Sequence, residues 1–456
     1  MRFIGREREL KTLEEEYRRD SSFIVIYGRR RVGKTTLIEK FIKGKPAVYF
    51  LADLQNELLQ LGRFKNVVAE TFRDEVLKGI EVKDWETIFR YILRHNTQGK
   101  LIIAIDEFQY LAKVNPAIPS ILQRIWDTLL KDSEAMLILS GSTVSMMYNL
   151  TLSYSSPLYG RRTAQIRLQP LDFFSYRSFF KGRKNDEIFR FYCVTGGIPK
   201  YAELMNPSKE VFTNIRENVL NRDSFLYSEP KFILREEIRD PITYFSILQV
   251  ISQGERKIGR IAGKLGMSTQ NLTSFMERLI ELDILERKVP VTERNPEKSK
   301  KGLYFIKDNF FNFWFRYVFP NQSFLETENY NLVMNKIKSD FNQYASLIFE
   351  DVCIDFLKKK NIHFRIERIG RWWNRDTEID ILAWGEGKVL FGECKYRDSR
   401  VGAEVLKELM EKSKRVNLGF KPKEIFFALF SKRGFTKDLK RSSFKNLLLY
   451  TVEDLV

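Results

Sequence analysis

The sequence predicts an α/β protein of several domains, the first of which is built around a parallel sheet. This prediction rests on the length of the chain, on apolar runs that alternate with helical patterns over residues 1–170, and on different patterns after residue 171. A chain of 456 residues is too long for one ordinary core, and its 43% of hydrophobic residues suffices to fill several. A single small module is therefore excluded, and bulk disorder is not expected.

Charge and cysteine content indicate which class of partner the protein binds and in which cellular compartment it is expected. Lys and Arg number 77 against 59 Asp and Glu, a net charge of +18, so the surface is expected to attract polyanions, above all nucleic acid. The three cysteines are widely spaced, which supports neither a disulfide framework nor a zinc site. No apolar run approaches the roughly 18 residues of a membrane span, and no signal peptide is recognisable. We expect a cytoplasmic protein with DNA as a partner and no membrane association; a homo-oligomer or a protein partner is also compatible.

Five apolar runs predict the strands of the first domain, residues 1–170. Several are nearly continuous, as expected for strands that helices cover on both faces. Helical patterns fill the intervals, which is typical of a doubly wound α/β domain. The expected strands are Phe23–Tyr27, Ala47–Ala52, Leu101–Ile105, Met136–Ser140 and Ala164–Leu168.

Four further segments are expected after this domain. Residues 171–239 are helical and polar, and are interrupted where glycines and a proline follow one another at 195–199, which suggests a helical lid. Residues 240–320 show three helical patterns followed by a basic hairpin, the order of a winged helix. A connector at 321–340 then leads to a last α/β domain at 341–456, which opens with a helix and carries a hairpin at 377–396.

One segment of the first domain has the spacing of a phosphate-binding loop. It fits GxxxxGK[ST] and lies after an apolar strand and before a helical pattern, as this chemistry requires. The glycines let backbone N–H groups surround the phosphates, Lys34 reaches the β and γ oxygens, and Thr35 ligates Mg²⁺. The residues expected at the nucleotide are Gly28, Arg29, Arg30, Arg31, Val32, Gly33, Lys34, Thr35 and Thr36.

Polar residues at the ends of two later strands complete the expected nucleotide site. Asp106 follows the apolar strand 101–105 and would join the magnesium shell, and Glu107 would lie beside the attacking water. A glutamate acting as general base contributes roughly 10²–10⁴-fold, so its presence favours hydrolysis over passive binding. We expect Ser140 beside the γ-phosphate, with Ser142 as the second choice.

The expected winged helix has polar groups suited to DNA. The helical pattern at 268–282 turns Thr269, Gln270 and Thr273 outward, and short polar side chains of this kind suit base edges. The hairpin that follows, at 287–301, contains six basic residues against two acidic ones, which suits contacts to phosphates. We therefore expect this segment to contact DNA.

A cluster of charges is expected in the last domain. Glu378 and Asp380 lie two residues apart on one strand of the hairpin, as Glu393 and Lys395 do on the other, so each pair shares a face. A metal site and a surface hairpin held by ion pairs are both compatible with this pattern.

The motifs of the first domain resemble the archaeal P-loop ATPases of the STAND class, relatives of AAA+ proteins. Segments 3–10, 157–162 and 196–199 also match that family's pattern. The resemblance implies ATP and Mg²⁺ as cofactors, with Pro199 packing on the adenine and Arg161 or Arg162 approaching the γ-phosphate; a surface salt bridge is the alternative for each arginine. Members of this class also use winged helices as internal spacers, which is the alternative to DNA contact.

The cluster of the last domain resembles the PD-(D/E)XK nuclease fold, although the proline before the acid is missing. The resemblance implies that Asp380, Glu393 and the Cys394 carbonyl hold Mg²⁺ or Mn²⁺ against a scissile phosphate. Lys395 would orient the hydroxide, and Glu350 would bind water or a second ion; Glu378 could replace Asp380 as ligand. The chain is thus expected to be an ATP-hydrolysing switch that engages DNA and positions a nuclease-like domain, the alternative being a regulator or partner-assembly switch that does not cleave DNA.

Overall fold

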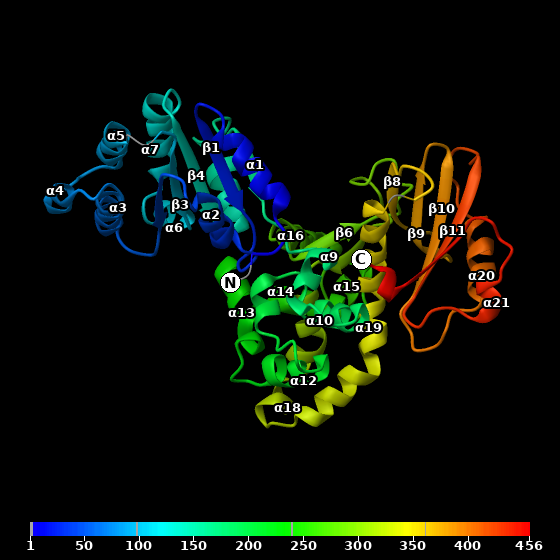
Figure 1. Cartoon of the computed structure of the whole chain (residues 1–456). Helices are drawn as coiled ribbons and strands as arrows, with labels where there is room; N and C mark the ends of the chain where they lie inside the picture. The colour runs from blue at the N-terminus through cyan, green and yellow to red at the C-terminus, as the bar shows by residue number, and fades with distance from the viewer. Residues whose placement is uncertain (1–2, 97–98, 239, 361) are drawn as a thin grey trace. The chain divides into compact units, whose positions relative to one another are not determined.

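The computed structural model describes residues 3–96, 99–238, 240–360 and 362–456 (Figure 1). Arg239, where the expected lid ends, lies outside the described residues. The chain divides into two compact units, Met1–Leu171 with Ile198–Lys200, and Asp172–Gly197 with Tyr201–Val456. None of the helices in the described ranges combines the length and the apolar character that crossing a membrane requires.

The first unit contains a parallel sheet of five strands in the order β2-β3-β4-β1-β5. This confirms the expected parallel α/β core. β1 and β3 are buried along their whole length, which explains why their sequences read as continuous apolar runs. The strands are β1 (Ser22–Tyr27), β2 (Ala47–Leu51), β3 (Leu101–Asp106), β4 (Ala135–Gly141) and β5 (Ala164–Arg167).

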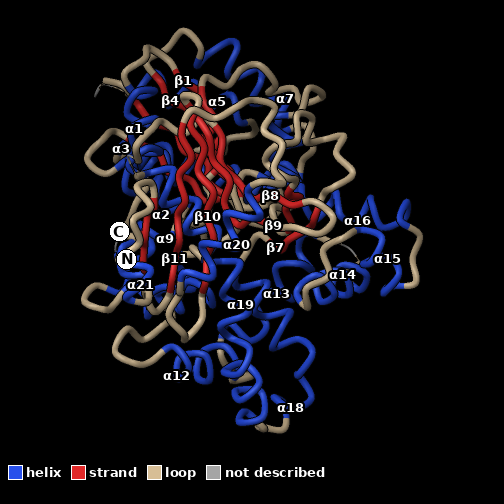
Figure 2. Tube along the Cα trace, turned by 90° about the vertical axis from the view of Figure 1, so that its right-hand side faces the viewer, coloured by secondary structure: helices blue, strands red, loops and turns tan. Residues whose placement is uncertain are grey.

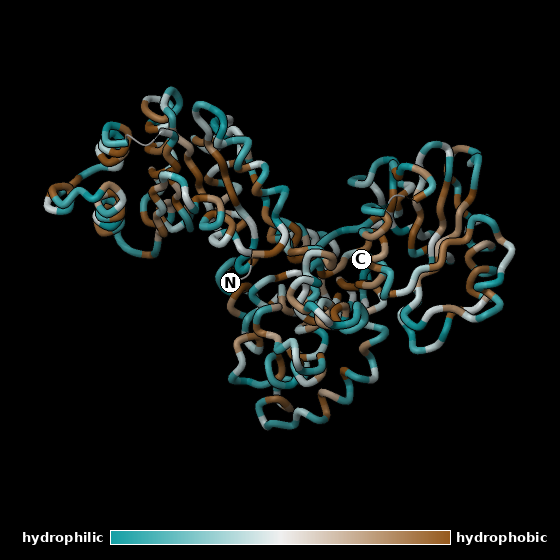
Figure 3. Tube along the Cα trace, viewed as in Figure 1, coloured by the Kyte–Doolittle hydropathy of each residue, from teal (hydrophilic) through white to brown (hydrophobic). Residues whose placement is uncertain are grey.

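Helices cover this sheet. Phe23 and Val25 of β1 belong to a core that includes Phe64 of α3 and Phe89 of α5, because alternate residues of a strand face opposite sides. Figure 3 shows hydrophobic colouring along the strands of this sheet. The helices are α1 (Glu7–Tyr17), α2 (Lys34–Ile42), α3 (Glu57–Phe72), α4 (Glu75–Gly79), α5 (Trp85–His95), α6 (Gln109–Val114), α7 (Ile118–Ile125) and α8 (Val144–Met147).

The second unit begins as a helical region, and Figure 2 colours the segment from α12 to α19 mostly as helix. α14, α15 and α16 are followed by the antiparallel pair β6 (Leu285–Lys288) and β7 (Leu303–Ile306). The segment expected as a connector is helical, because α19 runs unbroken from Tyr330 to Lys359 into the last part of the chain. The helices are α9 (Phe173–Tyr176), α10 (Asn185–Thr195), α11 (Pro199–Glu203, which begins in the first unit), α12 (Val211–Ile215), α13 (Phe225–Glu237), α14 (Ile242–Ser252), α15 (Ile258–Leu265), α16 (Thr269–Glu281), α17 (Asn309–Phe313) and α18 (Gln322–Glu326).

A mixed sheet ends the chain, in the order β12-β11-β10-β9-β8. β8, β9 and β10 are antiparallel, whereas β10, β11 and β12 are parallel. Figure 1 shows α19 on one side of this sheet and α20 on the other. The elements are β8 (Arg368–Trp373), β9 (Glu378–Gly385), β10 (Lys388–Lys395), α20 (Ala403–Ser413), β11 (Glu424–Ser431), α21 (Lys437–Lys440) and β12 (Leu447–Thr451).

Candidate functional site

The expected phosphate loop joins β1 to α2, and its glycines occupy positions that other residues would not tolerate. A Cβ added at Gly28 would lie 2.3 Å from the carbonyl oxygen of Leu168. Gly33, directly before α2, has φ 96°, a conformation that L side chains rarely adopt. The loop therefore turns from strand to helix with its backbone N–H groups at the N-terminal end of α2.

Lys34, the first residue of α2, lies across the loop. Its side chain is buried, and Nζ donates hydrogen bonds to the carbonyl oxygens of Gly28 at 2.9 Å and Arg29 at 3.0 Å. Arg6, from the segment before α1, donates to the carbonyl oxygen of Val32 at 3.0 Å. Hydrogen bonds from Lys34, at the end of the loop, and from Arg6, near the start of the chain, thus stabilise the loop.

Asp106 joins three parts of the site at the end of β3. Its carboxylate is fully buried and accepts hydrogen bonds from Thr35 Oγ1 at 2.7 Å and from the hydroxyl of Tyr49 at 2.9 Å. Thr35 and Asp106 lie together as a magnesium site requires, and their oxygens suit that ion. Burial, and next the Asp106 charge, raise the pKa of the Tyr49 hydroxyl far above its usual value, so Tyr49 stays a donor.

The carboxylate of Glu107 accepts hydrogen bonds from two neighbouring side chains. The backbone of this residue is in the left-handed region, with φ 54°. Ser142 Oγ donates to Glu107 Oε2 at 2.6 Å, and the Gln109 amide donates to the same oxygen and, at 3.2 Å, to Ser142 Oγ. Ser140 is fully buried, and its Oγ has no hydrogen-bond partner among the described residues. Of the two serines expected here, Ser142 therefore reaches Glu107 and Ser140 does not.

Several of these residues line one cavity of about 590 Å³, a volume within the range of nucleotide-sized sites. Pro199 also lines it, and its contact with the adenine, which the resemblance implies, stays a prediction. The lining residues are Arg30, Arg31, Gly33, Lys34, Thr35, Thr36, Leu51, Ala52, Glu107, Tyr110, Ser142, Pro199 and Lys200.

The two arginines considered as γ-phosphate contacts are engaged elsewhere. Arg161 forms an ion pair with Asp127 at 2.8 Å, and Arg162 donates to the side chain of Gln165 at 2.9 Å. Neither arginine lines the cavity. Arg161 thus makes the surface salt bridge that the sequence left as the alternative, whereas the partner of Arg162 is an uncharged amide.

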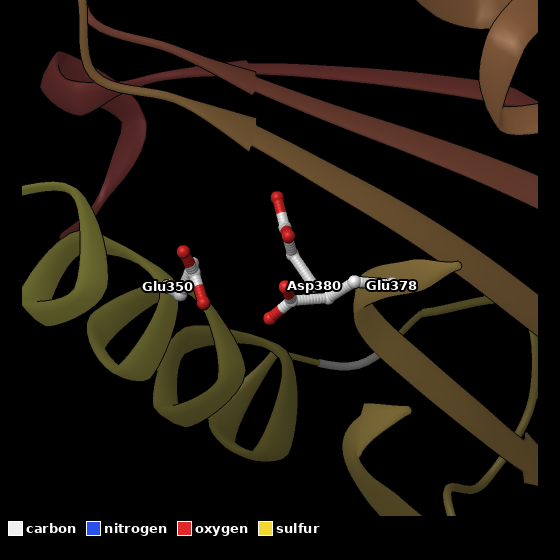
Figure 4. Close-up of side chains that lie close together, drawn as sticks. All are labelled: Glu350, Glu378 and Asp380. Carbon is white, nitrogen blue, oxygen red and sulfur yellow. The ribbon is translucent and has the colours of Figure 1, made fainter. Parts of the chain in front are cut away.

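The second unit contains a group of three acidic side chains. Carboxylate oxygens of Glu350 on α19 and of Glu378 and Asp380 on β9 all lie within 4.8 Å of one another. Figure 4 shows the helix presenting Glu350 towards the two strand residues. Three carboxylates at this spacing can hold a hard divalent cation such as Mg²⁺ or Mn²⁺.

Burial makes the carboxyls of Glu350 and Asp380 costly to ionise. It raises the pKa of Glu350 well above its usual value and, with the Glu393 charge added, that of Asp380 to about 7. Arg371 partly offsets this for Glu350 through an ion pair of 2.9 Å between two side chains that are nearly inaccessible to solvent. A divalent cation would relieve the remaining negative charge, so the residues fit such an ion.

Glu393, an expected ligand, lies beside this acidic group and is neutralised by two lysines. Its carboxylate contacts Lys395 Nζ at 2.7 Å and Lys412 Nζ on α20 at 3.0 Å. Burial lowers the pKa of Lys395, but the charge and hydrogen bond of Glu393 together with the Asp380 charge outweigh it and the net shift is upward, so this lysine is charged. The Cys394 N–H donates to Asp380 at 2.8 Å. The structure thus groups Glu378, rather than Glu393, with Asp380 and Glu350.

The basic hairpin loop between β6 and β7 lies against β8. Val291 N–H donates to the Arg371 carbonyl at 2.9 Å, and Trp373 Nε1 donates to the Lys301 carbonyl at 3.2 Å. Lys288 is paired with Asp351 at 2.8 Å. Some of the hairpin's basic residues are thus used inside the fold, whereas four are exposed: Lys301, which is paired with Glu293 at 2.8 Å, and Arg294, Lys298 and Lys300.

Several site residues were not predicted from the sequence. Tyr49 and Gln109 join the nucleotide site, and Arg371 and Lys412 join the acidic group. For Tyr49 the only sequence signal was its place in a predicted strand of the same sheet, Ala47–Ala52. The other three residues carry no motif, and only their neighbours in space identify them.

A parallel sheet whose first loop, Thr35 and Glu107 line one cavity, with Asp106 bound to Thr35, defines a P-loop ATPase. A family model described as an ATPase domain predominantly from Archaea matches residues 3–205, and one described as Archaea bacterial proteins of unknown function matches residues 314–412. An uncharacterized protein of Methanocaldococcus jannaschii is 38% identical over 462 residues, with 99% of each chain covered. The chain belongs to this archaeal ATPase family.

Two further similarities concern a short stretch of the chain and the fold. An uncharacterized ATP-binding protein of M. jannaschii is 48% identical over 44 residues, which are 9% of this chain and 75% of that protein. Among solved structures, a Walker-type ATPase of Pyrococcus abyssi is similar with a TM-score of 0.53 and 20% identity, covering 69% of this chain and 96% of that one. At this identity the likeness is one of fold.

Proposed function

We propose that the chain is an ATP-hydrolysing switch whose nucleotide state controls a metal-dependent, nuclease-like centre acting on DNA. One observation carries the ATPase half: the loop lysine, Thr35 and Glu107 line one cavity, and Asp106 binds Thr35 from β3. Family membership supports the same half. The nuclease half rests on the acidic group in the second unit and on the resemblance of its sequence pattern to PD-(D/E)XK enzymes.

Each residue of the nucleotide site has a role that its position supports. The loop N–H groups and Lys34 bind the phosphates, and release of Lys34 from the Gly28 and Arg29 carbonyls accompanies binding. Thr35 and Asp106 would hold Mg²⁺, which neutralises phosphate charge when bound. Glu107 accepts the proton of the attacking water, and Ser142 orients its carboxylate.

Two substitutions test the ATPase assignment. Lys34→Ala removes the charge that contacts the phosphates and should abolish ATP binding, measured by calorimetry. Glu107→Gln keeps the shape but not the base, so ATP should bind while turnover falls roughly 10²–10⁴-fold. Wild-type turnover by either variant would refute the assignment.

For the second unit we propose four parts. Residues 171–239 form a helical lid, 240–320 a winged helix, 321–340 a connecting helical segment, and 341–456 a nuclease-like domain. The order of α14, α15, α16 and the β6–β7 hairpin supports the winged helix. α19 followed by β8, β9 and β10 supports the nuclease-like domain, because it brings Glu350 to Asp380. The three free cysteines, all buried, support a reducing cytoplasm.

In the nuclease-like centre, Glu350, Glu378 and Asp380 would hold Mg²⁺ or Mn²⁺, which activates water and screens a phosphodiester when bound. Lys395 is charged and partly exposed beside them, so it can orient the attacking hydroxide. Glu393 keeps that lysine in place.

Cleavage of labelled DNA tests this proposal directly. Linear, branched and single-stranded DNA are incubated with Mg²⁺ or Mn²⁺, with and without ATP. The wild type should cut, and Glu378→Ala/Asp380→Ala and Glu393→Ala/Lys395→Ala should not. Lys407→Ala, an exposed lysine on α20, is the matched control and should cut normally.

A second candidate function is a DNA-binding regulator that does not cleave. The ion pairs Glu350–Arg371 and Glu393–Lys412 favour it, because a charge network of this kind can serve structure alone. Intact ATP hydrolysis without cutting of any substrate would select this alternative.

A further inference from the structure

A small cavity in the second unit lies beside the acidic group, because Ile348 and Asp351, which line it, flank Glu350 on α19. It has a volume of about 150 Å³ and is formed by the loop after α14, by β7, by α17 and the turn that follows it, and by α19. Three basic side chains line it, Arg256, Lys307 and Arg316, together with two acidic ones, Glu286 and Asp351. The cavity is much smaller than the nucleotide cavity of the first unit.

All of these charges but one have a partner of opposite charge. Arg316 is paired with Asp340 at 2.7 Å, and Lys307 is paired with Asp283. The two acidic side chains are also paired, because Lys288 forms ion pairs with both Glu286, at 2.9 Å, and Asp351.

Arg256 is the exception. Its guanidinium forms no hydrogen bond or ion pair with any residue in the described ranges. It stacks on the ring of Phe305 with 4.8 Å between the guanidinium carbon and the ring centre, and Arg371 stacks on the same ring at 5.4 Å. Two guanidinium groups thus share one aromatic ring, and only Arg371 has carboxylate partners.

The surroundings make an unpaired charge at this position unfavourable. Burial lowers the pKa of Arg256, and repulsion from Arg371 adds to the effect. The charges of Glu350 and Glu378 oppose this shift without reversing it, and neither carboxylate forms an ion pair with Arg256 in the described part of the chain. A partly buried charge without a partner costs free energy that an anion in the cavity would offset. The side chains of Asn312 and Gln343 also line the cavity, and neither forms a hydrogen bond within the described part of the chain. The cavity therefore offers a guanidinium and two amides, all with donors available.

We propose that this cavity binds a single phosphate group through Arg256, with Asn312 and Gln343 as further donors. A guanidinium matches phosphate with two parallel hydrogen bonds, and the volume admits one phosphate but not a nucleoside, which needs a site of about 300 Å³ or more. The ligand is either inorganic phosphate or a phosphate of a DNA strand. The inference goes beyond the proposed function and does not require ATP hydrolysis or DNA cleavage.

Calorimetric titration of the full chain with inorganic phosphate tests the site. All proteins carry Lys34→Ala, which weakens phosphate binding at the nucleotide loop, and chloride keeps the ionic strength constant. Arg256→Gln should weaken phosphate binding at least about tenfold, as expected for loss of charge-assisted hydrogen bonds. Arg260→Gln removes an exposed arginine of α15 and should bind phosphate like the parent.

A second variant keeps the test decisive if Arg256→Gln folds poorly. Asn312→Ala leaves every charged group in place and should weaken phosphate binding about threefold or more. Equal phosphate affinity of the parent, Arg256→Gln and Asn312→Ala would overturn the proposal.

Competition identifies the source of the phosphate. A DNA oligonucleotide with a 5′-phosphate and its unphosphorylated counterpart are each added to the titration. Displacement of phosphate by DNA that requires Arg256 assigns the site to a nucleic acid strand. Phosphate binding without such displacement assigns it to inorganic phosphate.

Discussion

At the scale of single residues, the position of Glu107 depends on side chains outside the sequence motifs. Ser142 and Gln109 share one of its carboxylate oxygens. A general base contributes only when it is held within hydrogen-bond reach of the proton it removes. The serine and the glutamine therefore act on the rate through Glu107 and need not contact ATP.

We expect Ser142→Ala to lower kcat for ATP hydrolysis about tenfold, the equivalent of one well-placed hydrogen bond, while KM changes less than about twofold. Steady-state kinetics measures both constants. Ser140→Ala, at a buried hydroxyl without a partner, is the control and should keep kcat within about twofold. A higher kcat in Ser142→Ala would show that the hydrogen bond restrains Glu107 away from the water.

A second prediction at this scale concerns pH. The Lys432 ammonium, with help from Asn342, holds the pKa of Asp398 at about 2, below its usual 3.8. Because the folded pKa is the lower one, the stabilisation is complete above about pH 4 and is lost as the pH falls towards 2. The Asp398 carboxylate is mostly exposed, so solvent screening keeps its contribution to the free energy of unfolding below about 1 kcal/mol.

Urea unfolding of Asp398→Asn checks this prediction. The variant should be less stable than the wild type at pH 7, and the gap should close as the pH is lowered from 4 to 2. Asp132→Asn, an exposed aspartate, should show no gap at either end. A gap that stayed constant with pH would mean that the carboxylate charge is not the cause.

At the scale of elements, α19 organises the second unit. It spans 30 residues, carries Glu350, and buries Phe349 completely. The Phe349 ring lies 5.6 Å from that of Phe189 on α10 and 5.4 Å from that of Tyr396 after β10. One side chain thus packs the helical region onto the final sheet.

Phe349→Ala should therefore lower the free energy of unfolding of the second unit by about 3–5 kcal/mol, since it leaves a cavity that packed neighbours fill only partly. Chemical denaturation followed by tryptophan fluorescence measures the change. Leu332→Ala, on the same helix but 43% exposed, should cost less than about 1 kcal/mol. Equal losses in the two variants would contradict the packing role.

At the scale of the whole molecule, the basic side chains that give the net charge of +18 differ in their surroundings, because some are paired and others are exposed. Many basic side chains are paired inside the fold, as Lys288 and Arg371 are. Arg294, Lys298 and Lys300 are exposed in the hairpin loop next to β8. Under the proposed DNA-binding function, these three are the hairpin charges available to phosphates.

Reversal of these three charges to Glu should weaken DNA binding and reduce the slope of log K against log salt by about 2.7, at about 0.9 for each lost phosphate contact. Fluorescence anisotropy with a labelled duplex at several salt concentrations gives the slope. Lys181→Glu/Lys184→Glu/Lys336→Glu makes the same change in net charge at other exposed lysines and should retain most of the slope. Equal slopes in the two triple variants would rule out the hairpin as the contact.

The sequence alone determined the parallel core and the nucleotide loop. A phosphate loop is a local object: Gly28, Gly33 and Lys34 are needed within one turn between a strand and a helix, so spacing and flanking hydrophobicity suffice to recognise it. The strands of the first unit were readable for the same reason, because strands buried on both faces are continuous apolar runs. The pairing of Asp380 with Glu350 was predicted only through a family resemblance.

Only the tertiary structure decided which side chains complete each site. Tyr49 reaches Asp106 because β2 lies beside β3, and Ser142, not Ser140, reaches Glu107 because of where β4 ends. That Arg256 has no ion pair within the described residues likewise becomes visible only when every charge around its cavity has been placed. Such contacts join residues far apart in the chain, and their energies depend on strand order and burial, which no local spacing encodes.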